Sequence, residues 1–186
     1  MLKTTLDYAN LYGAMHAKYE KYFAGKVRGI DVVVDLVKKT KPRNLLDYGS
    51  GRGYQYLVNR QHEAWGGVLP YCYDVGVRQL RQRPEGTFDG ILCCDMMEHI
   101  DEADVDVVLT DIFGFSAERR GQARSFVYFH ISCIPSIGKT LPDGRNVHLT
   151  QKPPEWWNER LRRFERSGLV IEARYETTTR EDRRPC

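Results

Sequence analysis

Residues 45–53 read Leu45-Leu46-Asp47-Tyr48-Gly49-Ser50-Gly51-Arg52-Gly53, a short hydrophobic run that ends in three alternating glycines. The run predicts a buried strand, and the residues from Tyr54 to about Gln61 predict a helix. Glycines at such a junction permit a tight turn and let a ligand approach the backbone closely. Asp74 follows 21 residues after Gly53, at the end of the next expected strand, where an acidic side chain accepts hydrogen bonds from ribose hydroxyls. Together these features indicate a nucleoside-binding α/β fold.

Expected strands and helices alternate along the whole chain. Hydrophobic patterns predict strands over 44–48, 71–74, 88–95, 125–131 and 169–178, and helices over 8–22, 31–39, 54–61, 102–115 and 153–168. This alternation is typical of a parallel sheet with helices on both faces, and ordinary strand lengths predict about five strands. Residues 1–186 are interpreted as a single domain, with N-terminal helices over 1–43, an α/β core over 44–178 and a tail over 179–186. The N-terminal tyrosine stripe, formed by Tyr8, Tyr12, Tyr19 and Tyr22 together with Met15, either packs into the core or forms a lid over the ligand.

The class of ligand follows from what the glycine-rich stretch lacks. Neither the G-x-G-x-x-G pattern of dinucleotide-binding folds nor the lysine-containing P-loop is present. Asp47, at the tip of the first strand, would repel a phosphate and would suit a ligand that carries an ammonium or sulfonium group. These residues resemble class I S-adenosylmethionine-dependent methyltransferases. Residues 88–100, FDGILCCDMMEHI, resemble the fourth-strand segment of that family, and 11–16, 144–150 and 155–157 resemble a subgroup of small bacterial and phage methyltransferase-domain proteins.

The resemblance implies a Rossmann-like methyltransferase fold with a reduced, mostly parallel sheet. Only 13 residues separate Asp74 from Phe88, so the third strand of the family, like its final strand, is expected to be short or absent. The implied cofactor is S-adenosylmethionine, which becomes S-adenosylhomocysteine once its methyl group has passed to an oxygen or nitrogen atom. The implied cofactor-binding residues are Asp47, Tyr48, Gly49, Gly51, Gly53 and Asp74, with Cys94, Asp95 and Met96 expected near the adenine.

Methyl transfer from a sulfonium requires alignment of donor and acceptor, and at most a base for the acceptor. The candidate catalytic residues are Glu98 and His99, which follow the 88–95 strand, and His148, in the long polar loop 135–152. His130 is interpreted as a core histidine. No group of histidines, cysteines and acids has the sequence spacing of a metal site, so no metal is expected. Acceptor contacts are predicted at Arg145, Asn146, His148 and Trp156.

Composition narrows the choice of partners. No stretch is long and apolar enough to span a bilayer, and the five cysteines, without C-x-x-C spacing, favour free thiols in a reducing cytoplasm. The net charge is only +3 and no run of five basic residues occurs, so a nucleic-acid partner is not expected. The loop and nucleophile motifs of nucleobase methylases are missing, which favours a small-molecule acceptor. Two alternatives stay open: a non-catalytic S-adenosylmethionine-binding regulatory module, and an RNA- or protein-directed methyltransferase. The oligomeric state is also open.

Overall fold

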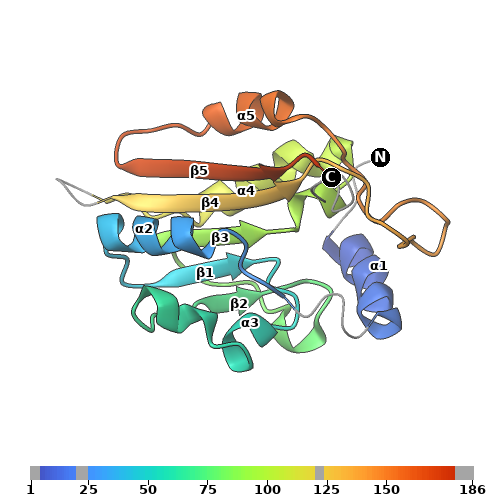
Figure 1. Cartoon of the computed structure of the whole chain (residues 1–186), viewed down its shortest axis with the longest axis horizontal. Helices are drawn as coiled ribbons and strands as arrows, with labels where there is room; N and C mark the ends of the chain where they lie inside the picture. Colours follow the sequence, from blue (N-terminus) through green and yellow to red (C-terminus); the bar gives the residue numbers. More distant parts are fainter. Residues whose placement is uncertain (1–4, 20–24, 120–123, 179–186) are drawn as a thin grey trace, which may run out of the picture.

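The computed structural model describes residues 5–19, 25–119 and 124–178, which form an α/β fold around one sheet of five parallel strands (Figure 1). The order across the sheet is β2-β1-β3-β4-β5, and every neighbouring pair is parallel. The prediction of a parallel sheet of about five strands is confirmed. The strands are β1 (Leu45–Tyr48), β2 (Tyr71–Tyr73), β3 (Gly90–Cys94), β4 (Ser125–Ser132) and β5 (Leu169–Glu176).

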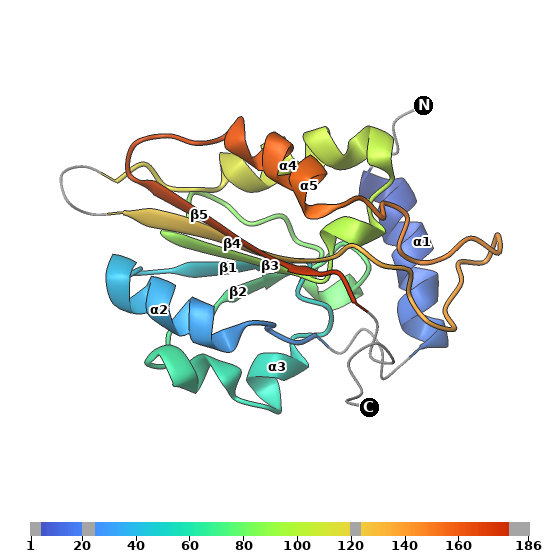
Figure 2. The ribbon, with the colours of Figure 1, turned by 45° about the horizontal axis from the view of Figure 1, so that its top comes forward.

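Helices lie on both faces of the sheet, and one helix lies across its end (Figure 2). The helices α2 (Ile30–Thr40) and α3 (Tyr54–Leu57) cover one face, while α4 (Val105–Gly114) and α5 (Pro154–Arg162) cover the other. The helix α1 (Thr5–Lys18) stands beside the carboxyl ends of the strands. Four short 3-10 helices complete the described elements: η1 (Gln61–Trp65), η2 (Arg78–Leu80), η3 (Met97–His99) and η4 (Glu102–Asp104). None of the described helices has the length and apolar character to cross a membrane.

The interior strand β4 shows how the sheet divides the core in two. Its side chains alternate between the faces, because successive residues of a strand point in opposite directions. Val127, Phe129 and Ile131 pack with α4 and α5 on one face. Phe126 and Tyr128 pack with α2 on the other face. A strand that is buried on both faces has a nearly continuous run of apolar residues, and this run predicted the strand over 125–131.

Several predicted elements are shorter than their sequence patterns. The helix predicted over 54–61 ends at Leu57, and the chain turns at Arg60 with a φ of 49° before η1 begins. The helix predicted over 153–168 ends at Arg162. Between Asp74 and Phe88 the only regular element is η2, so no strand forms there. Tyr22, the last member of the N-terminal tyrosine stripe, lies outside the described residues.

The tyrosine stripe of α1 serves as core and as wall at once. Tyr8, Tyr12 and Met15 are buried in the cluster that also holds α4 and α5. Tyr8 and Tyr12, with His16 one turn further, also line a cavity at the carboxyl edge of the sheet. Ligands of open parallel sheets bind at this edge, where the chain leaves adjacent strands in opposite directions. Here β1 and β3 are that pair, because the chain runs from β1 to β2 on one side and later from β3 to β4 on the other.

Candidate functional site

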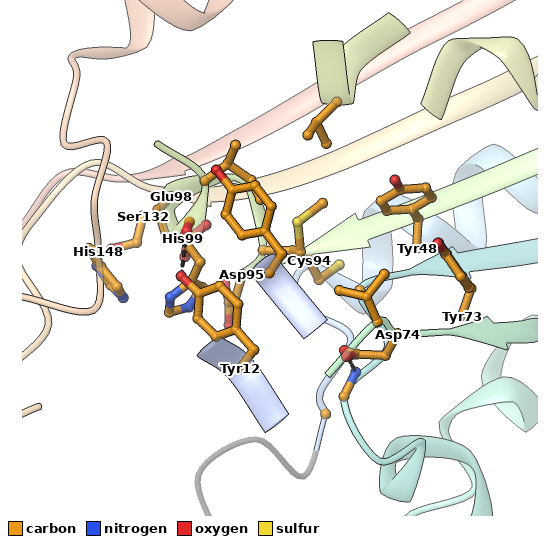
Figure 3. Close-up of a pocket in the computed structure, with 18 of the residues that line it drawn as sticks. Tyr12, Tyr48, Tyr73, Asp74, Cys94, Asp95, Glu98, His99, Ser132 and His148 are labelled. Carbon is orange, nitrogen blue, oxygen red and sulfur yellow. Dashed lines mark hydrogen bonds between the residues drawn. The ribbon is translucent and has the colours of Figure 1, made fainter. Parts of the chain in front are cut away.

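A cavity of about 1350 Å³ opens along the carboxyl edge of the sheet (Figure 3). Its two ends have different chemistry. The first, here named the glycine-loop end, is formed by Tyr48, Gly49, Gly51, Tyr73 and Asp74. The second, named the histidine end, is formed by Glu98, His99, Ser132 and His148. Asp95 and Cys94 lie between the two ends.

The glycine loop is held tightly against the end of β2. The amides of Gly49 and Ser50 both donate to the carbonyl oxygen of Tyr73, at 2.8 Å and 3.2 Å. Gly49 has a φ of 81°, and a Cβ atom placed on it would lie 2.3 Å from Cγ of Met96. Only glycine therefore fits this position, because it adopts a positive φ without strain and leaves room for Met96. Gly49, Gly51 and Met96, all predicted site residues, line the cavity.

Asp74 ties the loop and the second strand together from the cavity wall. Its Oδ2 atom accepts a hydrogen bond from the amide of Gly51 and its Oδ1 atom accepts one from the amide of Gly76, both at 2.8 Å. The imidazole of His16 on α1 lies 3.7 Å from the same carboxylate. The structure thus brings Asp74 to the cavity and next to the glycine loop, which is the arrangement that the sequence predicted.

Asp47 lies behind the glycine loop and does not line the cavity. Its carboxylate is 3% exposed and accepts hydrogen bonds from Nε2 of Gln55 at 2.8 Å and from the hydroxyl of Tyr56 at 2.7 Å. Burial raises the pKa of Asp47 to about 6, although these two hydrogen bonds oppose the shift. The side chain therefore anchors α3 under the loop. Gly53, also predicted to contact the ligand, stands outside the described lining and caps the start of α3 with a φ of 71°.

An aromatic wall beside Asp74 was not predicted. The ring centroids of Tyr48 and Tyr73 are 5.1 Å apart, and Phe115 lies 6.4 Å from Tyr48. The hydroxyl of Tyr48 donates to Asp111 on α4 at 2.7 Å. Arg83 also pairs with Asp111 at 2.7 Å and stacks 4.6 Å from the centroid of Phe115. The irregular segment that replaces a third strand thus supplies part of the cavity wall.

Asp95 is the most constrained residue in the middle of the cavity. Its φ of 53° is unusual for a side chain other than glycine. One carboxylate oxygen lies 2.6 Å from Nδ1 of His130, and the other accepts a hydrogen bond from Arg28 at 3.0 Å. Burial raises the pKa of Asp95, but the hydrogen bond and charge of His130 and the charge of Arg28 outweigh it, so the net pKa is lowered. His130, interpreted from the sequence as a core residue, is half-buried and paired with this acid.

Glu98 is buried at the histidine end without a full hydrogen-bond partner. Its side chain is 1% exposed, and neither carboxyl oxygen forms a hydrogen bond of ordinary geometry with any residue that the structure describes. Burial and the charge of Asp95 raise the pKa of Glu98 well above its ordinary value, although the backbone amides of Glu98 and Ser132 lower it. A buried acid in this state favours the protonated form unless a cation joins it.

The two histidines of this end are oriented by backbone carbonyls. Nδ1 of His99 lies 2.8 Å from the carbonyl oxygen of Val147, and Nδ1 of His148 lies 2.6 Å from that of Ile134. Because a carbonyl only accepts, both Nδ1 atoms carry the proton. The rings meet edge to face with centroids 5.0 Å apart. Burial lowers the pKa of His99 to about 4, and the charge of the neighbouring His148 lowers it further to a smaller extent. Burial also lowers the pKa of His148.

The structure joins the three predicted catalytic residues in one cluster. One potential ligand atom from each of Glu98, His99 and His148 lies within 4.8 Å of the others. The spacing along the sequence did not indicate this cluster. Glu98 and His99 belong to η3, but His148 comes from a loop 49 residues later in the chain. Spacing rules detect only ligands that are close in sequence.

The predicted acceptor contacts other than His148 are not in the described cavity lining. Asn146 shapes the loop instead: its side-chain oxygen accepts from the amides of Ser136 and His148, at 3.1 Å and 2.9 Å. Arg145 is exposed and pairs with Asp143 and Asp101. Trp156 stacks under the guanidinium of Arg160, 3.4 Å from the ring centroid. These residues support the loop and α5 rather than the cavity.

Comparisons with known proteins add no relative. No protein-family model, curated protein or solved structure matches this chain.

Proposed function

We propose that this protein is an S-adenosylmethionine-dependent methyltransferase with a Rossmann-like fold, acting on an oxygen or nitrogen atom of a small-molecule acceptor. One observation carries the proposal: Asp74, at the end of β2, is bonded to the glycine loop at the end of β1, and both line a cavity at the switch point of a parallel sheet. A glycine loop with a second-strand acid at this place is the arrangement that binds a nucleoside in such sheets.

The glycine-loop end offers a partner for each part of S-adenosylmethionine, the methyl donor (hereafter the donor). The loop backbone would hold the amino-acid portion, and the carboxylate of Asp74 would accept hydrogen bonds from the ribose hydroxyls. The adenine would lie against the wall formed by Tyr48, Tyr73 and Phe115, since flat aromatic surfaces stack well on a planar base. The one cationic side chain of the loop, Arg52, is outside the described lining and donates to the carbonyl oxygen of His16. The loop lies over buried Asp47, whose negative charge favours a cationic ligand over a phosphate.

The histidine end is the proposed place of the acceptor. S-adenosylmethionine supplies a methyl group that is already activated, so the protein's task is to orient the acceptor and remove its proton. With lowered pKa values, His99 and His148 are neutral at physiological pH and present imidazole rings at the cavity wall. The acceptor atom would form a bond to the methyl carbon while the carbon–sulfur bond breaks, its proton passing to this end of the cavity, and S-adenosylhomocysteine would leave.

Release of S-adenosylhomocysteine from pooled small-molecule acceptors tests the proposal. We expect at least one pool to yield product with the natural chain and markedly less with Asp74→Asn. Donor binding without product in any pool would favour the non-catalytic regulatory module. Strong RNA binding that weakens steeply with salt would favour an RNA-directed enzyme. A lack of donor binding would contradict the proposal in all its forms.

A further inference from the structure

The histidine end carries an inference that goes beyond methyl transfer. We propose that Glu98, His99 and His148 bind one divalent transition-metal ion, with the open side of the ion facing the cavity. Their potential ligand atoms lie within 4.8 Å of one another, close enough that small side-chain rotations would bring all three onto one ion with bonds of about 2.0–2.2 Å.

The burial of Glu98 is the first independent observation for a cation. A carboxyl group that is 1% exposed and makes no full hydrogen bond with the described residues is costly to bury, and buried charges in proteins are paired or coordinate metals. Among the described neighbours, Asp95 is already engaged by His130 and Arg28. A metal ion would give the Glu98 carboxylate the partner that it otherwise lacks.

The orientation of the histidines is the second observation. Metal-bound histidines usually donate their second ring N–H to a carbonyl or carboxylate, which fixes the ring and directs the other nitrogen to the metal. The Nδ1 contacts of His99 with Val147 and of His148 with Ile134 have this form. Nε2 of each ring would then be the ligand atom.

The backbone holds the two ligand-bearing segments in register. The carbonyl oxygen of Glu98 accepts hydrogen bonds from the amides of Leu149 and Thr150, at 2.7 Å and 3.0 Å. The hydroxyl of Thr150 donates to the carbonyl oxygen of Ile100 at 2.7 Å. Because these bonds hold the loop that carries His148 against η3, the three side chains stay near one another before any ion binds.

The ligand set selects the class of metal. Two imidazole nitrogens and one carboxylate oxygen suit Zn²⁺, Fe²⁺ and similar ions, whereas Mg²⁺ and Ca²⁺ prefer oxygen ligands throughout. Three protein ligands leave a position open, as in catalytic zinc sites. All three residues line the cavity, so the open position faces the space where an acceptor would bind.

The role of the ion rests on the proposed function, although its binding does not. An ion at this place would hold a hydroxyl group of the acceptor and lower the pKa of that hydroxyl. The hydroxyl proton would pass to solvent, the oxygen would form a bond to the methyl carbon, and the electron pair of the broken carbon–sulfur bond would stay on sulfur. The acceptor would then be a hydroxyl compound rather than an amine.

Metal titration of the full chain, stripped with a chelator, tests this site. We expect Zn²⁺ to bind one ion per chain, and Co²⁺ to give visible absorption typical of nitrogen and oxygen ligands. Glu98→Gln and His148→Ala should each weaken Zn²⁺ binding by about tenfold or more. The matched controls are Glu102→Gln, on an exposed acid paired with Lys152, and His62→Ala, in η1; both should leave Zn²⁺ binding unchanged.

Two results would overturn the site. One is equal Zn²⁺ affinity in His148→Ala and the natural chain; the other is near-ultraviolet absorption from Co²⁺–thiolate bonds, which would move the ion to the cysteines. If Glu98→Gln does not fold, His148→Ala decides alone. Titration of S-adenosylmethionine in the presence of chelator separates the proposals: donor binding without Zn²⁺ binding removes the metal site only, and the reverse removes the methyltransferase only.

Discussion

The glycine-loop end and the histidine end share one edge of the sheet, but they differ in how their acids are satisfied. Asp74 and Asp47 each accept two hydrogen bonds, from backbone amides in the first case and from Gln55 and Tyr56 in the second. Glu98 is as buried as Asp47 and accepts no hydrogen bond of ordinary geometry from the described residues. The acids of the first end have their hydrogen-bond partners within the protein, whereas Glu98 at the second end has buried oxygens that a bound ligand could engage.

Because the acids of the two ends differ in this way, we expect substitutions at the two ends to affect different properties of the protein. Changes at the glycine-loop end alter backbone geometry, so they should affect both folding stability and donor affinity. Changes at the histidine end lie away from the glycine loop and from Asp74, so they should leave the affinity for S-adenosylmethionine intact. Four substitutions test this division.

The largest effect on pH dependence is expected from Asp47→Asn. Between pH values of about 4 and 6 the folded chain keeps the proton on Asp47, whose pKa is raised to about 6, while the unfolded chain has already lost it. The natural chain therefore loses stability as the pH rises through this window. Asparagine does not ionise, so the stability of the variant relative to the natural chain should grow by about 2–2.5 kcal/mol from pH 4 to pH 7. Urea unfolding at several pH values measures it, and a constant difference would contradict the account.

Gly49→Ala should lower the free energy of unfolding by about 2–3 kcal/mol, because the new Cβ meets Met96 at a positive φ. Donor affinity should fall as well. Gly67→Ala is the matched control, since Gly67 has a φ of 85° and nothing within 4 Å of a Cβ. The control should cost only the backbone strain, about 1–2 kcal/mol, and spare donor binding. Equal losses in both variants would show that Met96 does not restrict the loop.

Asp74→Asn should weaken S-adenosylmethionine binding by about tenfold, or roughly 1.4 kcal/mol, because a charged acceptor becomes neutral and one backbone amide loses its partner. Asp143→Asn, on an exposed loop acid paired with Arg145, serves as control. Calorimetry measures both. Unchanged affinity in a folded Asp74→Asn chain would remove the ribose assignment.

The smallest effect is expected from His148→Ala, which should change the affinity for S-adenosylmethionine less than about twofold, or 0.4 kcal/mol. The residue lies at the opposite end of the cavity from Asp74 (Figure 3). Turnover should fall while donor binding stays. A tenfold loss of donor affinity would instead place His148 in the donor site and end the division between the two ends.

The features that sequence predicted well are local. The glycine loop, the acid after β2 and the doubly buried strand β4 each follow from a few adjacent residues. Asp47 is a residue for which the sequence was misleading. Neighbouring residues of a strand point to opposite faces, so Asp47 and Tyr48 cannot both face the cavity. Asp47 points to the face that holds Tyr56, while Tyr48 lines the cavity.

The features that sequence missed depend on the path of the chain. The aromatic wall combines β1, the end of β2 and Phe115, which follows α4, and the cluster at the histidine end joins η3 to a distant loop. No periodicity or motif predicts that these segments come together, because their contact depends on strand order and on hydrogen bonds such as that from the amide of Thr150 to the carbonyl oxygen of Glu98. The individual residues could be chosen from the sequence, but their convergence could not.

Titration of the purified chain with S-adenosylmethionine, and then with S-adenosylhomocysteine, decides whether the glycine-loop end binds the methyl donor. We expect saturable binding of both, one molecule per chain, with the affinity reduced in Asp74→Asn and retained in His148→Ala. Absence of binding by either compound would contradict it, and the glycine loop would then be a structural turn in a cavity that serves another ligand.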